Sequence, residues 1–190
     1  MAWWLISFHY ENVYTVVFTW NIYCKLTKNI FIWLQISIGC KYIYPDGKTK
    51  FTGTIGNIGT TSFYPSKNLG AYGDGGIVTT NNKNLFNKIY YLRNLGTIKK
   101  NVHQYEGLNS RLDTLQATIL LEKVKFTHAH NDFRRKISSF YDKQLSSIKE
   151  VKLTLSKPGS SRHLYVIRIK KRNKLASFLL KNKVPIQYHY

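Results

Sequence analysis

The sequence is poor in acidic residues: its 190 residues include nine aspartates and glutamates against 29 lysines and arginines, which gives a formal net charge of +20. A charge of this size is typical of proteins that bind nucleic acid or anionic membranes. The basic residues are spread along the whole chain, however, and come with abundant asparagine, isoleucine and tyrosine, which indicates a general compositional bias. We therefore expect neither nucleic acid nor membrane as the partner, and we keep a basic binding protein as the alternative function.

Cysteine is scarce as well, because Cys24 and Cys40 are the only two and neither belongs to a CxxC pair. A zinc site and a disulfide framework are therefore not indicated, and we expect no metal. Long hydrophobic runs are absent too. No apolar run in residues 1–40 reaches the roughly 18 residues of a membrane span, and the segment lacks the features of a signal peptide. These absences favour a protein of the cytoplasm.

Residues 1–40 differ in composition from the rest of the chain. They hold all four tryptophans and almost no acid. Two runs of β-branched and aromatic residues, 13–20 and 30–37, predict buried strands. We have no functional interpretation of this segment, and we expect it to be unrelated to the sequence that follows it.

The segment around Lys67 contains the clearest indication of a function. The runs 60–64 and 77–80 predict two strands, and between them lie a turn with Lys67 and a glycine-rich loop at 70–76. A lysine amine can form a Schiff base with a carbonyl where its surroundings lower its pKa. The hydroxyl of Ser62 can donate a hydrogen bond to a phosphate. Pyridoxal phosphate has both groups, although on spacing alone Lys67 could also be a solvated loop residue.

Further helix and strand signals follow this stretch. Apolar residues recur at helical spacing in residues 83–96 and again from about 110 to 145, and a helix as long as the second would bridge two domains. Residues 163–169 alternate as a strand does, and residues 173–182 have the pattern of an amphipathic helix. Another strand is predicted to begin at Val184.

Two sequence motifs stand in this part of the chain. The first begins with Ser62-Phe63 and continues with Lys67, then Asn68-Leu69-Gly70 and the glycine loop 73–76; the second is Gly107 followed by residues 109–113, NSRLD. Together they resemble the DegT/DnrJ/StrS family of sugar aminotransferases, and two motifs in this order are far more specific than one. The resemblance extends from about residue 41 to 190. It implies the α/β fold of aspartate aminotransferase, fold type I, and pyridoxal 5'-phosphate as the cofactor.

The resemblance implies a role for each matching residue. Lys67 would bind the cofactor covalently and shuttle a proton, and Ser62 would bind the cofactor phosphate. Asn109 would reach the phosphate of the neighbouring subunit, which implies a homodimer with a shared active site. His163 and His189 would lie near the sugar nucleotide. The implied reaction moves an amino group from an amino acid, usually glutamate, to a keto-sugar nucleotide of surface-polysaccharide or secondary-metabolite synthesis. Related dehydratases have histidine in place of Lys67, so this lysine favours amino transfer.

The chain departs from the family in its first part. Family members carry a long segment before the serine, which supplies a phosphate-binding loop and an aspartate that pairs with the pyridine nitrogen of the cofactor. The only acids before Ser62 are Glu11 and Asp46, and neither matches that aspartate. We therefore expect a fragment that binds the cofactor poorly by itself and lacks activity, and an inactive remnant of the enzyme is a further possibility.

The resemblance also implies a division into domains. We expect the C-terminal half of the large domain and most of the small domain. The boundaries are an unrelated head at 1–40, the end of the large cofactor-binding domain at 41–110, a long bridging helix at 111–146 and an incomplete small domain at 147–190.

Overall fold

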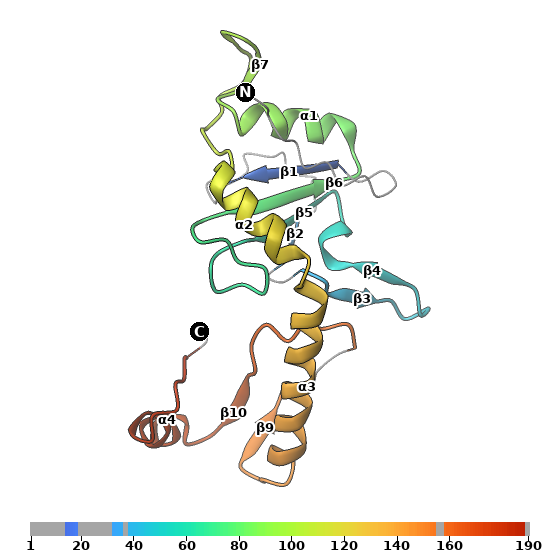
Figure 1. Ribbon diagram of the computed structural model, residues 1–190. Coiled ribbons are helices and arrows are strands. Elements are labelled where there is room, and N and C mark those ends of the chain that lie inside the picture. Colours follow the sequence, from blue (N-terminus) through green and yellow to red (C-terminus); the bar gives the residue numbers. More distant parts are fainter. Residues whose placement is uncertain (1–13, 19–31, 36–37, 155–157, 189–190) are drawn as a thin grey trace.

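The computed structural model describes residues 14–18, 32–35, 38–154 and 158–188. A small sheet has helices beside it, and a long helix leads from the sheet to a smaller group of elements near the C-terminus (Figure 1). The loop that carries Lys67 connects two central strands of the sheet and contacts the long helix.

The sheet has four strands in the order β1-β6-β5-β2, which are β1 Tyr14–Phe18, β6 Gly76–Thr80, β5 Ile58–Ser62 and β2 Ile32–Gln35. β5 and β6 pair antiparallel with Ser62 opposite Gly76, which confirms the two strands predicted around Lys67. β1 is antiparallel to β6, and β2 is parallel to β5. Strands are therefore confirmed within 13–20 and 30–37, whereas the predicted burial of their side chains lies outside the described residues.

Helix α1 (Lys83–Leu92) packs on this sheet. It begins at Asn82, whose side chain accepts hydrogen bonds from two backbone N–H groups of the first turn and so caps the helix. Ile89 of α1 is 2% exposed and packs with Ile58 and Val78 of the two central strands. The buried face predicted for this helix is thus its contact with the sheet.

The end of α1 differs from the prediction, which extended the helix to Gly96. The helix ends at Leu92, because Leu95 and Gly96 have φ angles of 58° and 69°, in the left-handed region that an α-helix excludes. The N–H of Leu95 donates to the carbonyl of Leu108, and the N–H of Gly96 donates back to Tyr91. The chain therefore leaves the helix axis before residue 96.

The prediction of one continuous helix over residues 110–145 is wrong. Two helices are present, α2 (Thr114–Val124) and α3 (Thr127–Leu145). Between them the N–H of Phe126 donates to the carbonyl of Lys123, a tighter turn that interrupts the α-helical ladder. Figure 1 shows α2 beside the sheet and α3 leading away from it, and the division of the chain into domains stays a prediction.

The elements after α3 are a hairpin and a helix, which are β9 Val151–Leu153, β10 Ile167–Ile169 and α4 Arg172–Lys181. The strand predicted at 163–169 is confirmed only for its last three residues, because the residues before them make side-chain contacts with α3 and with the loop that carries Lys67. The helix predicted at 173–182 is confirmed with a shift of one residue at each end. The strand predicted from Val184 is wrong over residues 184–188, and residues 189–190 lie outside the described part.

Two short hairpins complete the structure, together with a 3₁₀ turn at Thr52–Thr54 that leads toward β5. They are β3 Lys41–Ile43 with β4 Thr49–Phe51, and β7 Thr97–Lys99 with β8 Val102–His103. Both hairpins project from the body of the molecule in Figure 1.

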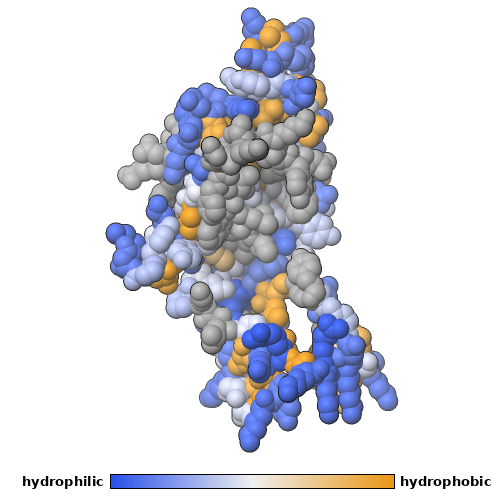
Figure 2. Space-filling view, turned by 180° about the vertical axis from the view of Figure 1, so that it is seen from behind, coloured by the Kyte–Doolittle hydropathy of each residue, from blue (hydrophilic) through white to orange (hydrophobic). Residues whose placement is uncertain are grey.

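Many large apolar side chains are exposed to solvent. Figure 2 shows hydrophobic residues at the surface among hydrophilic ones in the lower part of the molecule. On α3, Phe133 and Phe140 are 63% and 59% exposed. Among the residues that the structure describes, no helix is both long and apolar enough to cross a membrane.

The contact between α1 and the sheet gives the first prediction. Ile89→Ala removes a side chain that is 2% exposed and should lower the free energy of unfolding by about 2–4 kcal/mol, because it leaves a cavity between Ile58 and Val78. Leu115→Ala, at a site that is 65% exposed, is the control and should change it by less than about 1 kcal/mol. Urea unfolding followed by circular dichroism measures both changes, and equal losses would contradict the prediction.

Candidate active site

Lys67 ends a tight β-turn that starts at Tyr64. The N–H of Lys67 donates to the carbonyl of Tyr64 over 2.9 Å, and Pro65 occupies the second position, where its fixed φ suits the turn. Gly70 lets the chain pass close behind, because a Cβ added there would lie 2.3 Å from the carbonyl oxygen of Pro65. The backbone around Lys67 is thus closely packed, and its side chain is half-buried.

Ser62 lies at the end of β5, just before this turn. It is 8% exposed, and its hydroxyl accepts a hydrogen bond of 3.2 Å from the N–H of Tyr64. The next residue, Phe63, donates its N–H to the carbonyl of Gly75 over 2.7 Å. Ser62 therefore ends strand β5, and Lys67 lies five residues later, at the end of the turn that follows the strand.

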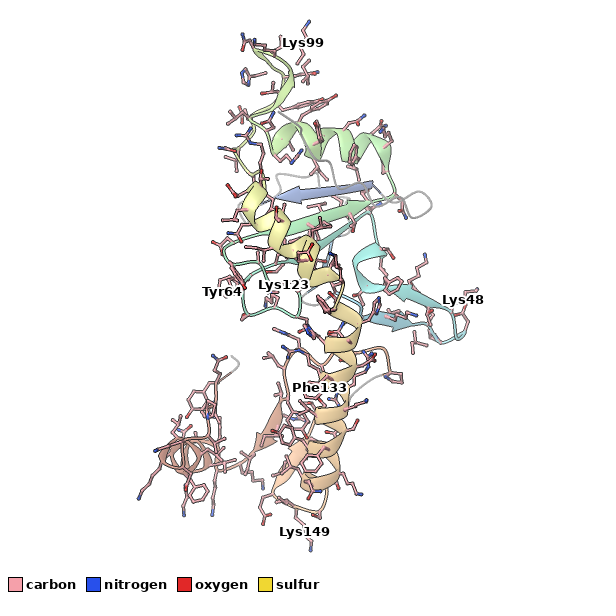
Figure 3. All side chains as sticks on the ribbon, viewed as in Figure 1. Lys48, Tyr64, Lys99, Lys123, Phe133 and Lys149 are labelled. Carbon is pink, nitrogen blue, oxygen red and sulfur yellow. The ribbon has the colours of Figure 1, made fainter. Side chains whose placement is uncertain are left out.

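Helix α2 holds the glycine-rich loop that follows Lys67. The amine of Lys123 donates to the carbonyl of Gly70 and lies 5.4 Å from the ring centre of Tyr72. The side chain of Gln116 accepts a 2.8 Å hydrogen bond from the N–H of Tyr72. Figure 3 shows Tyr64 on the outer side of this loop and Lys123 on the neighbouring helix.

Asn68 joins this loop to the C-terminal half of the chain. Its amide nitrogen donates to the side-chain oxygen of Asn131 on α3, over 2.8 Å, and to the carbonyl of Ser161, over 3.3 Å. Its side-chain oxygen is 2.9 Å from Nδ1 of His163. Asn68, Asn131 and Ser161 are all buried, and Asn131 also donates to the carbonyl of Ile38 over 2.9 Å.

The segment that carries His163 is held on α3 by Asp142. Arg162 forms an ion pair with the Asp142 carboxylate at 2.6 Å, and the hydroxyl of Tyr165 donates to the same carboxylate over 2.9 Å. Arg134 donates to the carbonyl of His163 over 3.3 Å. Burial, together with the bond to Asp142 and its charge, raises the pKa of Tyr165 to about 12.

Asn109 lies on the segment that leads from β8 to α2, at the C-terminal end of α1. Its backbone pairs with Asn94, and its side-chain oxygen accepts a 3.2 Å hydrogen bond from Arg111. Burial lowers the pKa of the nearby Arg93, an effect that Tyr90 opposes and that the charge of Arg111 increases. Asn109 is exposed, and the positively charged side chain of Arg111 lies against it.

A model of the DegT/DnrJ/EryC1/StrS aminotransferase family matches residues 37–190. The chain belongs to this family. The match includes every residue predicted for the site, and the resemblance stated from the two sequence motifs is confirmed.

Two curated relatives illustrate the likeness. The chain is 38% identical over 140 residues to the erythromycin biosynthesis sensory transduction protein EryC1 of Saccharopolyspora erythraea, which covers 73% of this chain and 38% of the relative. It is 34% identical over 155 residues to the UDP-2-acetamido-2-deoxy-3-oxo-D-glucuronate aminotransferase of Pseudomonas aeruginosa, covering 81% and 42%. The chain spans about two fifths of the length of the curated relatives it matches.

A solved structure agrees with these relatives. A DegT/DnrJ/EryC1/StrS aminotransferase from Brucella abortus has a TM-score of 0.74 and 32% sequence identity, covering 82% of this chain and 41% of that one. The aminotransferase PseC of Helicobacter pylori, at 24% identity and a TM-score of 0.74, supports the fold alone. The predicted α/β fold of fold type I aminotransferases is therefore confirmed for this part of the family fold.

The structure brings together some of the predicted site residues of this family member. Ser62 and Lys67 lie in one connection, and His163 is hydrogen-bonded to the residue that follows Lys67. Asn109 lies on a different segment, beside α1. His189 lies outside the described residues. The roles given to these residues stay predictions.

Sequence reasoning gave no role to Asn68 or to Arg111, although both stand inside the family motifs. A signal for Asn68 was its position directly before the apolar residues Leu69 and Ala71, where a buried amide needs partners. Arg111 stands two residues from Asn109, which in an extended segment puts both side chains on the same face. The partners of Asn68, in contrast, were not visible in the sequence.

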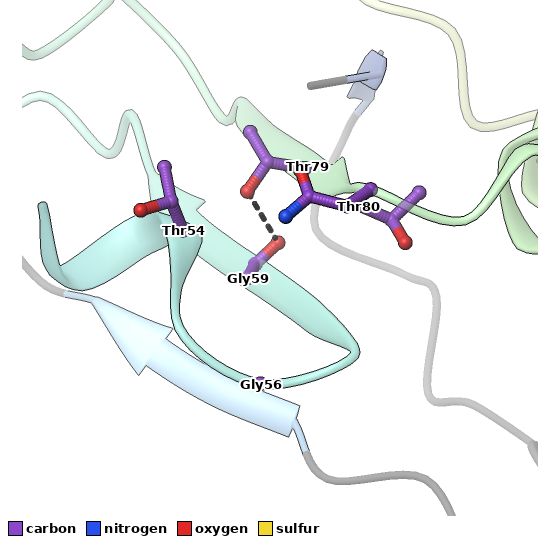
Figure 4. Close-up of a pocket in the computed structure, with 6 residues that line it drawn as sticks. Thr54, Gly56, Gly59, Thr79 and Thr80 are labelled. Atoms are coloured by element: carbon purple, nitrogen blue, oxygen red, sulfur yellow. Dashed lines mark hydrogen bonds between the residues drawn. The ribbon is translucent and has the colours of Figure 1, made fainter. Parts of the chain in front are cut away.

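A small cavity lies at the opposite end of the β5–β6 pair (Figure 4). Thr54, Gly59, Thr79 and Thr80 help to line it, and the hydroxyl of Thr79 is 3.5 Å from the carbonyl oxygen of Gly59. Gly59 pairs with Thr79 at this end of the strands, whereas Ser62 lies at the other end. This cavity is therefore not part of the site around Lys67.

The packing of Gly70 gives a prediction about the turn. Gly70→Ala should lower the free energy of unfolding by about 1–3 kcal/mol, because the added carbon collides with the backbone of Pro65. It should also speed hydrogen exchange at the N–H of Lys67. Gly73→Ala is the matched control, because its Cβ would meet only the Gln116 side chain, at 3.4 Å. The prediction is wrong if the two variants behave alike.

The contact between Tyr165 and Asp142 predicts a pH dependence of stability. The tyrosine pKa is about 10 in the unfolded chain and about 12 in the folded one, so the folded chain keeps the proton better. The stabilisation is complete below about pH 10 and is lost as the pH rises toward about 12. Tyr165→Phe should therefore flatten the loss of stability in this window, measured by urea unfolding.

The control for this measurement is Tyr64→Phe, at an exposed position. It should keep the pH dependence of the unaltered protein. A Tyr165→Phe variant that loses stability between pH 10 and 12 as steeply as the unaltered protein would show that another group is responsible.

Proposed function

We propose that this chain is part of a pyridoxal-phosphate-dependent sugar-nucleotide aminotransferase in which Lys67 binds the cofactor. The observation that carries the proposal is the position of Lys67 in a closely packed turn beside the buried hydroxyl of Ser62, in a chain of this aminotransferase family. Such a turn presents an amine and a hydroxyl on a closely packed backbone. This suits a ligand that has an aldehyde at one end and a phosphate at the other.

The donor groups fit those two ends. The amine of Lys67 is the group that forms a Schiff base with an aldehyde. The hydroxyl of Ser62 accepts a bond from Tyr64 and, like any hydroxyl, can also donate one to a phosphate oxygen. The cofactor, when bound, supplies an electron sink for the charge left on the substrate carbon. A structural neighbour, NtdA of Bacillus subtilis, at 29% identity and a TM-score of 0.59, was solved with the cofactor PMP bound.

Each residue of the proposed site would act through its own chemistry. Nζ of Lys67 would hold the cofactor and act as the base that takes and returns a proton. Ser62 would orient the phosphate. Asn109, which stands beside Arg111 and near Arg93, would contribute to a phosphate site in a neighbouring subunit, since two arginine charges favour an anion there. A homodimer with a shared active site follows from this role of Asn109, and His163 and His189 are proposed for the substrate side.

The proposed substrates are an amino-acid donor, glutamate, and a keto-sugar nucleotide. Support comes from relatives whose names include UDP-linked and dTDP-linked sugars, such as the dTDP-3-amino-3,6-dideoxy-α-D-galactopyranose transaminase of Aneurinibacillus thermoaerophilus, 39% identical over 145 residues. We place the protein in the cytoplasm, where nucleotide sugars are made. The domain boundaries at residues 41–110, 111–146 and 147–190 belong to the same proposal.

The alternative function, a basic protein that binds an anionic polymer, has weaker support. It requires lysines and arginines on one continuous face. Lys48, Lys99 and Lys149 lie at three well-separated extremities of the molecule in Figure 3. These three lysines do not share one face, which agrees with compositional bias as the origin of the charge.

The test compares pyridoxal phosphate with pyridoxal, which lacks the phosphate. Because the chain by itself is expected to bind the cofactor poorly, it is incubated with excess reagent; the absorbance of a Schiff base should then appear, and Lys67→Ala should lower it much more than Lys99→Ala does. Pyridoxal should bind about tenfold more weakly, because a hydrogen bond to a charged group contributes about 1.5 kcal/mol. Ser62→Ala should remove most of this difference. Equal absorbance in Lys67→Ala and the unaltered chain would overturn the proposal.

A further inference from the structure

The side chain of Asn68 uses its donor and acceptor groups at the same time. Its NH₂ group donates to Asn131 and to the carbonyl of Ser161, and its oxygen lies 2.9 Å from Nδ1 of His163. An amide can make all these bonds together, whereas a carboxylate has no donor and an apolar side chain has neither group. Asn68 is 9% exposed, so each lost bond would leave a buried polar group without its partner.

These contacts determine which ring nitrogen of His163 carries a hydrogen. Because two acceptors fix the NH₂ group of Asn68, its oxygen must face His163, and Nδ1 of His163 must carry the hydrogen. The backbone of His163 is held as well, since its carbonyl accepts from Arg134 on α3. The imidazole therefore works as a fixed donor to the loop that carries Lys67.

The loop is thus anchored on both sides of Lys67. On one side the N–H of Lys67 is bonded to Tyr64, and on the other Asn68 is bonded to α3 and to the segment at 161–163. We propose that Asn68 and His163 are positioning residues, which together fix the backbone at Lys67 so that its amine meets an aldehyde carried by a phosphate-bearing ligand. This inference rests on the proposed function of Lys67.

The apolar residues around Asn68 indicate that its side chain orients the loop and does not only fill space. Leu69, directly after Asn68, belongs to an apolar cluster with Phe63 and Leu120, and an apolar residue at 68 would suit packing alone. A buried network of amides and an imidazole instead fixes direction, because hydrogen bonds are angle-dependent where apolar contacts are not. The network therefore determines how the turn is oriented relative to α3.

The experiment measures the reactivity of Lys67 without requiring catalysis. The full chain is treated with pyridoxal phosphate, the amine and aldehyde condense to a C=N bond with loss of water, and borohydride reduces that bond to a secondary amine. Peptide mass mapping then gives labelling of Lys67 relative to Lys99, an exposed lysine at the tip of a hairpin. The ratio compares two lysines in the same molecule and so corrects for reagent concentration.

We expect the ratio of Lys67 to Lys99 labelling to fall about tenfold in Asn68→Ala and in His163→Ala, in line with the cost of small misplacements of reacting groups. His163→Asn, whose side-chain N–H can replace the Nδ1 donor, should recover most of the ratio. Arg135→Ala is the matched control, because it removes an exposed ion pair with Asp132 on the same helix, α3, without touching Asn68 or the segment that carries His163. It should keep the ratio of the unaltered chain within about twofold.

The outcomes separate the two proposals. An unaltered chain that labels Lys67 no faster than Lys99 contradicts the proposed function of Lys67. Preferential labelling of Lys67 that persists in folded His163→Ala contradicts the positioning role, and so does an equal fall in Arg135→Ala. If Asn68→Ala does not fold, the pair His163→Ala and His163→Asn decides, because both keep the bonds of Asn68 to Asn131 and Ser161.

Discussion

The loop that carries Lys67 depends on one buried amide, that of Asn68. An amide taken from water costs several kcal/mol unless its hydrogen bonds are remade, and here they are remade by groups from two other parts of the chain. The loop, helix α3 and the segment at 161–163 therefore contribute to one another's stability. The Asp142 contacts with Arg162 and Tyr165 secure the same segment from its other side.

Independent contacts hold the loop from the sheet and from α2. Phe63 and Leu69 pack with Leu120 of α2, and Lys123 and Gln116 bind the backbone of the glycine-rich part. The backbone around Lys67 is thus fixed from three directions, while the lysine side chain itself stays half-buried. This combination suits a residue that must form and break a covalent bond at one defined position.

Local patterns predicted the central strands and the existence of α1, α3 and α4 well, because those elements depend on alternation or helical spacing within a few residues. The end of α1 and the break between α2 and α3 were missed. They depend on left-handed residues such as Leu95 and on a tight turn at Phe126, which leave the apolar spacing unchanged.

The candidate site was predictable in part for the same reason. Ser62 and Lys67 are five residues apart and share one motif, so the sequence alone indicated that they act together. The partners of Asn68, however, lie 63, 93 and 95 residues away along the chain, and only the folded structure brings them into contact. Asn109 was found through its motif, which also contains Arg111, whereas the nearness of Arg93 required the structure.

The exposed phenylalanines of α3 have a consequence for the behaviour of the chain in solution. Phe133 and Phe140 offer apolar surface to any other molecule they meet, and such surface promotes association. A net charge of +20 opposes this through mutual repulsion between molecules. Salt at about 0.1 M reduces the reach of that repulsion to about 10 Å. The colloidal stability of the isolated chain is therefore an electrostatic property, and it should decline as ionic strength rises.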